Sequence, residues 1–456
     1  IIIIVMNKSI SISKLILALL SLVITFFVWQ QGLKDSLNRP SVSFDITLKE
    51  SEISELAIPA VPSNLKKLLI PNDPLMDMRN TLFEFDFNDL SERNKLIWLT
   101  LKNEKDDFKD DYFEQFTIRK YSETAQILRK YYSNNSYLPN SEFLNDFKDD
   151  QYLFHLLNRK FDIPNKASIR SGIENKMFIK LLIIKSFPLL TILIGSFLVL
   201  KGSLKALWSK KIDWKSYKPL ELNLLDMVLL ISGGFVVLGE VFSPLISISI
   251  VDLIANDFAT EISQSLKIFF GYLFMSIPPL FIIFYQIKTI KKEFIIKDDY
   301  LQFNFKPFLK TLIEGFKGWL MIIPFVLLIS LLMNYLNINQ AGSNPLLEIV
   351  LNNNSYFAFI LLFITTTILA PFFEEIVFRG VLLPVLAREF GIILGIIISS
   401  FIFALAHLSI SEFPPLFVLG IGLGATRLLS GRLASSIFMH SFWNGLTFLN
   451  LFLLRT

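Results

Sequence analysis

The chain has 456 residues, of which 52% are hydrophobic, only 18% are charged and 45 are phenylalanine. An ordinary soluble protein carries about 25% charged residues, so the composition indicates a polytopic membrane protein and excludes a disordered chain. The absence of cysteine excludes disulfide-stapled folds, thiolate metal sites and cysteine enzymes. A net charge of +4 is too small to indicate a nucleic-acid partner, and we expect none.

The first predicted element is a membrane anchor within residues 1–31. Lys8 and Lys14 precede an apolar run from Leu15 to Trp29, as in a signal sequence. No small-residue cleavage site follows Trp29, so we expect an uncleaved signal anchor. The segment Ile1–Val5 precedes Met6 and is interpreted as an upstream misreading of the start.

A segment dense in charge follows the anchor. Gly32–Lys176 contains 45 of the 84 Lys, Arg, Asp and Glu residues of the chain, with the two signs nearly balanced. We expect a small soluble domain at 32–176 that is largely helical in its second half. There Asp110–Lys130 and Ser141–Lys160 have apolar residues near helical spacing. The domain is suited to dock a partner that the sequence does not identify.

Apolar runs dominate the rest of the chain. Residues 177–354 are expected to form transmembrane helices joined by Lys-rich loops, and residues 355–456 a distinct C-terminal core. With the anchor they predict an all-α membrane protein of about nine transmembrane helices. The expected spans are Met177–Leu200, Leu222–Phe242, Leu266–Ile287, Trp319–Leu336, Tyr356–Ala370 continuing toward Leu386, Ile392–Leu408, Leu416–Leu429 and Leu433–Leu453.

The short loops alternate in charge. Lys201–Lys218 and Lys288–Lys317 are rich in lysine, whereas Ser243–Ser265 and Asn337–Asn354 contain no Lys or Arg. Because positive loops face the cytoplasm, we expect both Lys-rich loops inside and the soluble domain on the far side of the membrane. The abundance of Ile, Lys, Asn and Phe is typical of an AT-rich genome. We expect a bacterial cytoplasmic membrane or an internal membrane.

The C-terminal part keeps ionisable residues inside apolar runs. Each costs about 2.5–3.5 kcal/mol at the bilayer centre, so each marks a functional site by default. Glu375 and Arg379 are four residues apart and lie on one helical face, where they can neutralise each other. Glu374 is rotated about 100° away and lacks that partner.

Two further segments show the same spacing. Phe403 and His407 are four residues apart, and so are His440 and Asn444. Three helices therefore each present a polar face that only another polar face or water can satisfy. Phe403 is expected to serve packing rather than chemistry.

Several chemistries suit these residues. A carboxylate beside an imidazole can deprotonate a water for peptide hydrolysis, and a second imidazole with an amide can stabilise the oxyanion. Alternatively Glu374, His407 and His440 could hold a zinc ion with an activated water. An ion-relay or transport site, and interhelical polar contacts without catalysis, also stay open. The chain has no H-E-x-x-H, no G-x-S-x-G and no Asp after Asp299, which disfavours zincin, serine and aspartyl intramembrane proteolysis.

The three segments resemble the motifs of the CPBP family of intramembrane proteases, which includes the CAAX prenyl endopeptidase and bacteriocin-processing proteins. The family pattern E-E-x-x-x-R, F-x-x-x-H and H-x-x-x-N/D is filled by residues between Glu374 and Asn444. The resemblance covers roughly Ser355–Leu453. It implies that Glu374 and His407 activate the water and that His440 and Asn444 stabilise the intermediate. It also implies that Arg379 pairs with Glu375 to hold the site.

The sequence thus predicts an intramembrane endopeptidase that acts on a membrane protein or peptide within the lipid bilayer. The family is often labelled metalloprotease, although its archaeal members resemble metal-free glutamate proteases, so the cofactor stays open between zinc and none. The alternatives are a catalytically silent membrane assembly factor on the same scaffold and a transporter.

Overall fold

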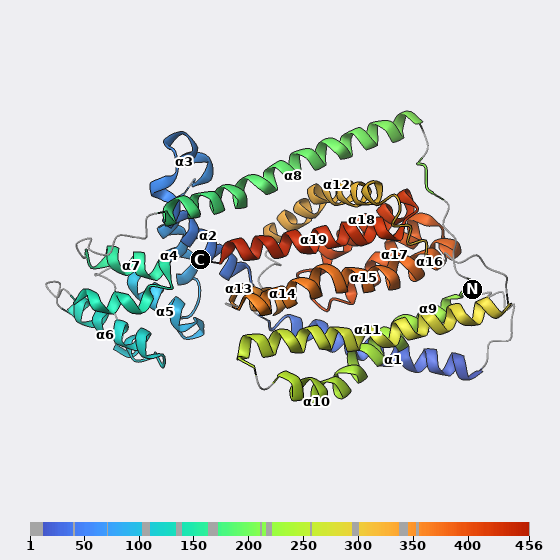
Figure 1. Ribbon diagram of the computed structural model, residues 1–456, viewed down its shortest axis with the longest axis horizontal. Helices are drawn as coiled ribbons and strands as arrows, with labels where there is room; N and C mark the ends of the chain where they lie inside the picture. Colours follow the sequence, from blue (N-terminus) through green and yellow to red (C-terminus); the bar gives the residue numbers. More distant parts are fainter. Residues whose placement is uncertain are drawn as a thin grey trace. The chain divides into compact units, whose positions relative to one another are not determined.

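The computed structural model describes residues 12–39, 42–70, 72–102, 110–133, 139–162, 172–209, 212–215, 221–255, 258–293, 301–336, 345–352 and 355–455 (Figure 1). These residues form helices and contain no strand, which confirms the predicted all-α class. The chain divides into two compact units. The membrane unit comprises Ile1–Ser41 and Leu190–Leu449, and the charged unit comprises Val42–Leu189 and Asn450–Thr456.

Eight helices of the described residues are long and apolar enough to cross a membrane. They are α1 (Ile12–Ser36), α8 (Ile173–Ser209), the continuous run of α9 (Leu224–Val228), η5 (Leu229–Phe242) and α10 (Ser243–Ala255), α11 (Thr260–Glu293), α12 (Phe308–Tyr335), the run Tyr356–Phe390, α18 (Phe413–Ser430) and α19 (Leu433–Leu454). The shorter apolar helix α17 (Ile392–Leu405) brings the total to the predicted nine, and the chain is an integral multi-pass membrane protein.

One predicted loop is a helix instead. Ser243–Ser265 was expected to connect two spans, but its first part forms α10, which packs against α11 (Figure 1). Val251 of α10 and Leu266 of α11 are both buried in one apolar cluster. Asp252 pairs across the same two helices with Lys267, at 2.8 Å between Oδ1 and Nζ. The apolar residues around Asp252 therefore extend the span, because its one charge finds a partner.

Other predictions fall outside the described residues. Ile1–Val5 and parts of the Lys-rich loops, at 210–211, 216–220 and 294–300, lie there, as does 337–344 of the loop without basic residues. The sidedness of the membrane and the fate of the signal anchor therefore stay predictions.

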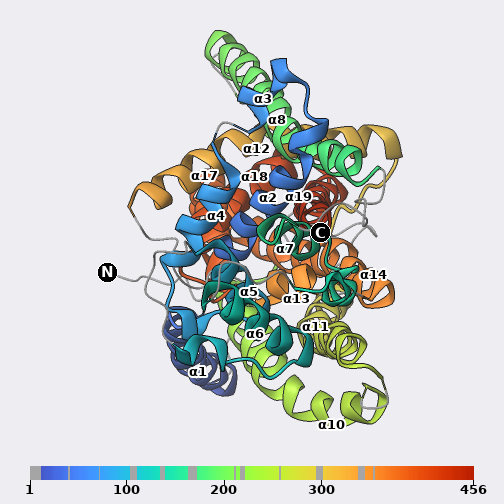
Figure 2. The same ribbon diagram turned by 90° about the vertical axis from the view of Figure 1, so that its left-hand side faces the viewer.

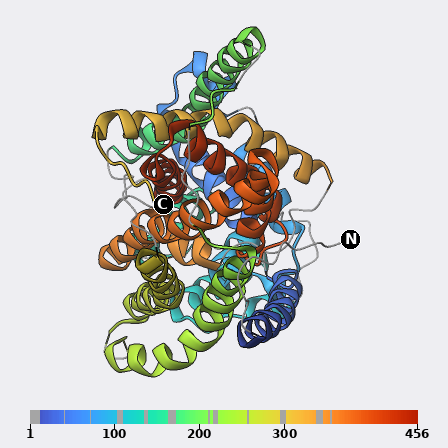
Figure 3. The same ribbon diagram turned by 90° about the vertical axis from the view of Figure 1, so that its right-hand side faces the viewer.

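The centre of the membrane unit is the run Tyr356–Phe390, which carries the two adjacent glutamates. Its segment η7 (Ile376–Leu382) has every residue buried. A helix that is covered on all sides lies in the middle of its bundle. Phe235 of η5, Phe403 of α17 and Leu419 of α18 belong with it to one apolar cluster. In Figure 3 the orange and red C-terminal helices lie between the gold helix α12 and the yellow-green and blue helices of the same unit.

The charged unit is helical in its second half, as predicted, and its first half is helical as well (Figure 2). Side-chain caps start the early helices: Asp73 accepts from the Leu75 backbone N–H and Ser91 from that of Asn94. Apart from the outer part of α8, the helices are α2 (Ser43–Ala57), η1 (Ile58–Ala60), α3 (Ser63–Leu69), α4 (Pro74–Phe83), η2 (Phe87–Asp89), α5 (Glu92–Leu101), η3 (Asp110–Phe113), α6 (Arg119–Ser133), η4 (Ser141–Phe147) and α7 (Gln151–Lys160).

A partly buried arginine joins three parts of this unit. Arg93 of α5 donates to both carboxylate oxygens of Glu52 on α2, at 2.6 and 3.0 Å, and to both oxygens of Asp150 before α7, at 2.6 and 3.0 Å. Burial alone would raise the pKa of the Glu52 carboxyl, but the Arg93 guanidinium and the Lys49 ammonium outweigh it and lower that pKa to about 2. The carboxylate is thus charged at every ordinary pH, and Arg93 is its main counter-ion.

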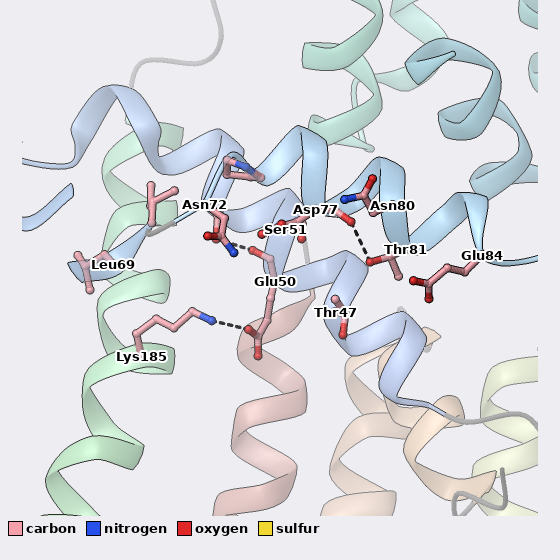
Figure 4. Close-up of a pocket in the computed structure, with 13 residues that line it drawn as sticks. Thr47, Glu50, Ser51, Leu69, Asn72, Asp77, Asn80, Thr81, Glu84 and Lys185 are labelled. Carbon is pink, nitrogen blue, oxygen red and sulfur yellow. Dashed lines mark hydrogen bonds and ion pairs between the residues drawn. The ribbon is translucent and has the colours of Figure 1, made fainter. Parts of the chain in front are cut away.

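A polar cavity of about 440 Å³ also lies in the charged unit, lined by residues of α2, α4 and α8 (Figure 4). Its walls carry the carboxylates of Glu50, Asp77 and Glu84 and the ammonium of Lys185. Lys185 Nζ lies 2.6 Å from Glu50 Oε2. The cavity therefore has a net negative lining, in contrast to the apolar interior of the membrane unit.

Replacing Arg93 tests the buried pairing. Arg93→Met removes the main counter-ion of the buried Glu52 and leaves it Lys49 at 3.1 Å, so the variant should destabilise the charged unit by about 3 kcal/mol at neutral pH. Hydrogen exchange of the full-length protein in detergent measures this loss at the amides of α2 and α5. The control Arg119→Met removes an exposed arginine paired with Glu123 and should leave the exchange of these amides as in wild type, because an exposed ion pair contributes little to stability.

The stability that the charged Glu52 contributes to this unit should fall as the pH is lowered. Because the pKa of Glu52 in the folded protein lies below its ordinary value of 4.5, the stabilisation is complete above pH 4.5 and is lost as the pH falls toward 2. Equal stability of wild type and Arg93→Met at neutral pH would contradict this account.

Candidate active site

The two adjacent glutamates lie where the central helical run is irregular. It consists of α14 (Tyr356–Ile364), the π-helical segment η6 (Thr365–Leu369), α15 (Ala370–Glu375), the π-helical segment η7 and α16 (Leu383–Phe390). Glu374 and Glu375 are the last residues of α15, between the two π-helical segments. Such π-helical segments are rare in proteins overall, and those that occur are often found at functional sites.

Asn444 supports the irregular turn before the glutamates. In η6 the Ala370 N–H donates to the Thr365 carbonyl, five residues earlier. The next bond of this pattern would go from residue 371 to the Thr366 carbonyl, but Pro371 has no N–H to donate. Asn444 of α19 supplies the missing donor, with Nδ2 at 2.8 Å from the Thr366 carbonyl oxygen. An amide has two N–H groups, and the second has no protein partner among the described residues.

Glu375 and Arg379 form a buried ion pair. Arg379 Nη1 donates to Glu375 Oε1 at 2.8 Å, and the two side chains are 1% and 0% exposed. Arg379 also donates to the Gly420 carbonyl of α18 at 3.4 Å, and its guanidinium carbon lies 4.1 Å from the centre of the Phe403 ring. The pair therefore links the glutamate segment to α18 and α17 as well as neutralising the charge.

His440 of α19 lies between the two carboxylates. Its Nδ1 is 3.0 Å from Glu375 Oε1, and its Nε2 is 3.8 Å from Glu374 Oε2. A carboxylate oxygen accepts, so Nδ1 carries the hydrogen and Glu375 fixes the orientation of the ring. Nε2 is then directed at Glu374, too far for a direct hydrogen bond.

Glu374 has one engaged and one unengaged oxygen. Its Oε1 accepts a hydrogen bond from the Tyr272 hydroxyl of α11 at 2.9 Å. Its Oε2 is buried and has no hydrogen-bond partner among the described residues. A buried polar atom without a partner is costly and requires an explanation, such as a water or a substrate. The 3.8 Å separation from His440 Nε2 suits one bridging water.

His407 approaches this group from the end of α17. Its Nδ1 lies 2.8 Å from the Phe403 carbonyl oxygen, so Nδ1–H donates and Nε2 keeps a lone pair. The Phe403 ring is fully buried, with its centre 4.8 Å from that of His407 and 5.8 Å from that of His440. Among the described residues, His407 makes no ion pair or hydrogen bond with Glu374 or Glu375.

The structure thus brings Glu374, Glu375, Arg379 and His440 into direct contact. It places His407 behind the Phe403 ring and Asn444 on the backbone of η6. Sequence reasoning missed Tyr272, which lies 102 residues before Glu374 and belongs to none of the three motifs. Its only sequence signal is a hydroxyl within an apolar span.

The residues proposed as zinc ligands do not form a metal site in this arrangement. No group of three or more His, Cys, Asp and Glu in the described residues is placed to hold a metal ion. Glu374 Oε1 is engaged by Tyr272, and the Nδ1 of each histidine is engaged in a hydrogen bond.

Two family models match the chain. Residues 356–446 match the type II CAAX prenyl endopeptidase Rce1-like family, which confirms the resemblance predicted for the C-terminal part. Residues 43–179 match a domain of unknown function, DUF8675. Searches of curated proteins and of solved structures find no match. The matched residues 356–446 contain Glu374, Glu375, Arg379, His407, His440 and Asn444 but not Tyr272.

The contribution of the Glu375–Arg379 ion pair to the stability of the protein can be measured. Arg379→Met leaves Glu375 charged and buried beside His440 alone, and should lower the free energy of unfolding by about 3–5 kcal/mol. Thermal or denaturant unfolding of the purified protein in detergent measures the loss. The double variant Arg379→Met/Glu375→Gln removes the orphaned charge and should recover part of it. If the single variant matched wild type, the pair would not hold the segment.

Proposed function

We propose that the Rce1-like domain at residues 356–446 is an intramembrane endopeptidase that hydrolyses peptide bonds of membrane-associated proteins or peptides. The observation that carries this proposal is the buried Glu374 Oε2, which has no hydrogen-bond partner among the described residues and faces His440 Nε2 at 3.8 Å. Both atoms can bind the same water molecule. Such a water sits in an apolar bundle, where a carboxylate base is effective.

Glu374 is the general base in this mechanism. As the water oxygen bonds to the substrate carbonyl carbon, one water proton moves to Glu374 Oε2 and the carbonyl oxygen becomes an oxyanion. The carbon–nitrogen bond then breaks, and Glu374 returns the proton to the leaving amine. The peptide is thereby cleaved into a new carboxylate end and a new amino end.

The remaining residues serve the intermediate and the base. His440, when both of its nitrogens are protonated, donates from Nε2 to the oxyanion, and the second N–H of Asn444 is a further donor. Glu375 and Arg379 hold the His440 ring. His407, with Nδ1–H bonded to the Phe403 carbonyl, keeps an acceptor at Nε2 that assists proton removal from the water. No step requires a metal ion.

The role of the base is tested by one isosteric change. Glu374→Gln keeps the shape and the acceptor for Tyr272 but removes the base, so it should abolish cleavage while the protein still inserts. Quantitative profiling of protein termini in the native membrane should find new N-termini near or within spanning segments for wild type only. The matched control is Glu389→Gln, because Glu389 is an exposed glutamate at the end of the same helical run.

Each outcome decides between classes of function. New termini that persist in Glu389→Gln and vanish in Glu374→Gln support the protease. Identical termini in all three strains, together with a growth or assembly defect in Glu374→Gln, would contradict it and favour a membrane assembly factor. Uptake or conductance that depends on Glu374 would instead indicate a transporter.

A further inference from the structure

Tyr272 reaches the reaction centre from outside the Rce1-like domain. It lies in α11, more than 80 residues before the matched segment 356–446 begins. Its hydroxyl donates to Glu374 Oε1 at 2.9 Å. Within the described residues it is the one side-chain donor that hydrogen-bonds the Glu374 carboxylate.

The ring of Tyr272 is packed against aromatic neighbours, in addition to the hydrogen bond of its hydroxyl. It meets Phe373 edge-on, with ring centres 5.9 Å apart and planes at 85°. Phe373 is 3% exposed and stacks on Phe235 of η5, with centres 5.9 Å apart and planes at 9°. A rotation of Tyr272 would therefore disturb a packed aromatic row. The row fixes the residue directly before Glu374, so backbone and hydroxyl are positioned together.

The hydrogen bond selects one orientation of the Glu374 carboxylate. The last torsion of a glutamate is broad and roughly two-fold, so packing alone does not fix which oxygen faces which neighbour. With Oε1 held by Tyr272, Oε2 points toward His440 Nε2. Without that donor the carboxylate is free to turn toward His440 and close the 3.8 Å gap by a direct hydrogen bond.

We propose that Tyr272 is a positioning residue, whose hydroxyl holds Glu374 so that its free oxygen and His440 share one water. The inference rests on the proposed function, because it assigns Tyr272 a task in that reaction. It also gives α11 a part in catalysis, so residues 356–446 alone do not make a complete site. Tyr272 itself touches no reacting atom.

The test separates the hydroxyl from the ring. Tyr272→Phe keeps the contact with Phe373 and removes only the donor. The matched control is Tyr285→Phe, which removes a hydroxyl from the same helix at a residue that is 63% exposed. Full-length wild type and variants are reconstituted into liposomes, and the probe is a peptide spanning a cleavage site found by termini profiling of wild type. Because a hydrogen bond to a charged group contributes about 1.5–3 kcal/mol, Tyr272→Phe should lower kcat about tenfold or more.

The split between kinetic constants identifies the role. KM should change less than about twofold in Tyr272→Phe, since the substrate does not contact the hydroxyl, and Tyr285→Phe should match wild type in both constants. An unchanged kcat in Tyr272→Phe, with Glu374→Gln inactive, would overturn the inference and leave the protease intact. A raised KM with unchanged kcat would also overturn it. Wild type and Glu374→Gln that are equally inactive on the probe would instead refute the proposed function.

Discussion

A buried negative charge in an apolar bundle is the constraint on which the site depends. Glu375 is fully buried, and its Oε1 is bound by Arg379 at 2.8 Å and by His440 at 3.0 Å. Without these partners the charge would cost several kcal/mol, so the helices that carry them must meet. One carboxylate thereby brings η7 and α19 together, and the Arg379 bond to the Gly420 carbonyl adds α18.

The same region departs from regular helix because it must present polar groups. Pro371 leaves the Thr366 carbonyl without its intrahelical donor, and Asn444 compensates from a neighbouring helix. Glu374 then emerges at the end of α15 with one oxygen held by Tyr272 and one oxygen unengaged. Each carboxylate has one buried oxygen without a hydrogen-bond partner among the described residues, but the two glutamates differ in how their charge is offset. Glu375 is bound by Arg379 and His440, whereas Glu374 accepts its hydrogen bond from the hydroxyl of Tyr272. That difference is the basis of the proposed division of roles, in which Glu375 holds the site together and Glu374 acts on the water.

Patterns within a single segment of the sequence predicted the spans and the contacts inside one helix. Hydropathy predicted the spans well, because each must be apolar over its whole length. The separation of Glu375 and Arg379 predicted the ion pair that the structure contains. Contacts between helices were beyond such patterns: the approach of His440 on α19 to the two glutamates on α15 is indicated by no local spacing. Tyr272 was invisible for the same reason, since no local period relates residues 102 positions apart.

The central claim is that a water activated by Glu374 cleaves the peptide bond, and isotope transfer tests it most directly. Purified wild type and Glu374→Gln in liposomes are incubated with a cleaved membrane peptide in water labelled with the heavy oxygen isotope, and the products are analysed by mass spectrometry. The account predicts one labelled oxygen in the new carboxylate end for wild type and no product for Glu374→Gln. Unlabelled product, or equal labelled product from both proteins, would contradict it.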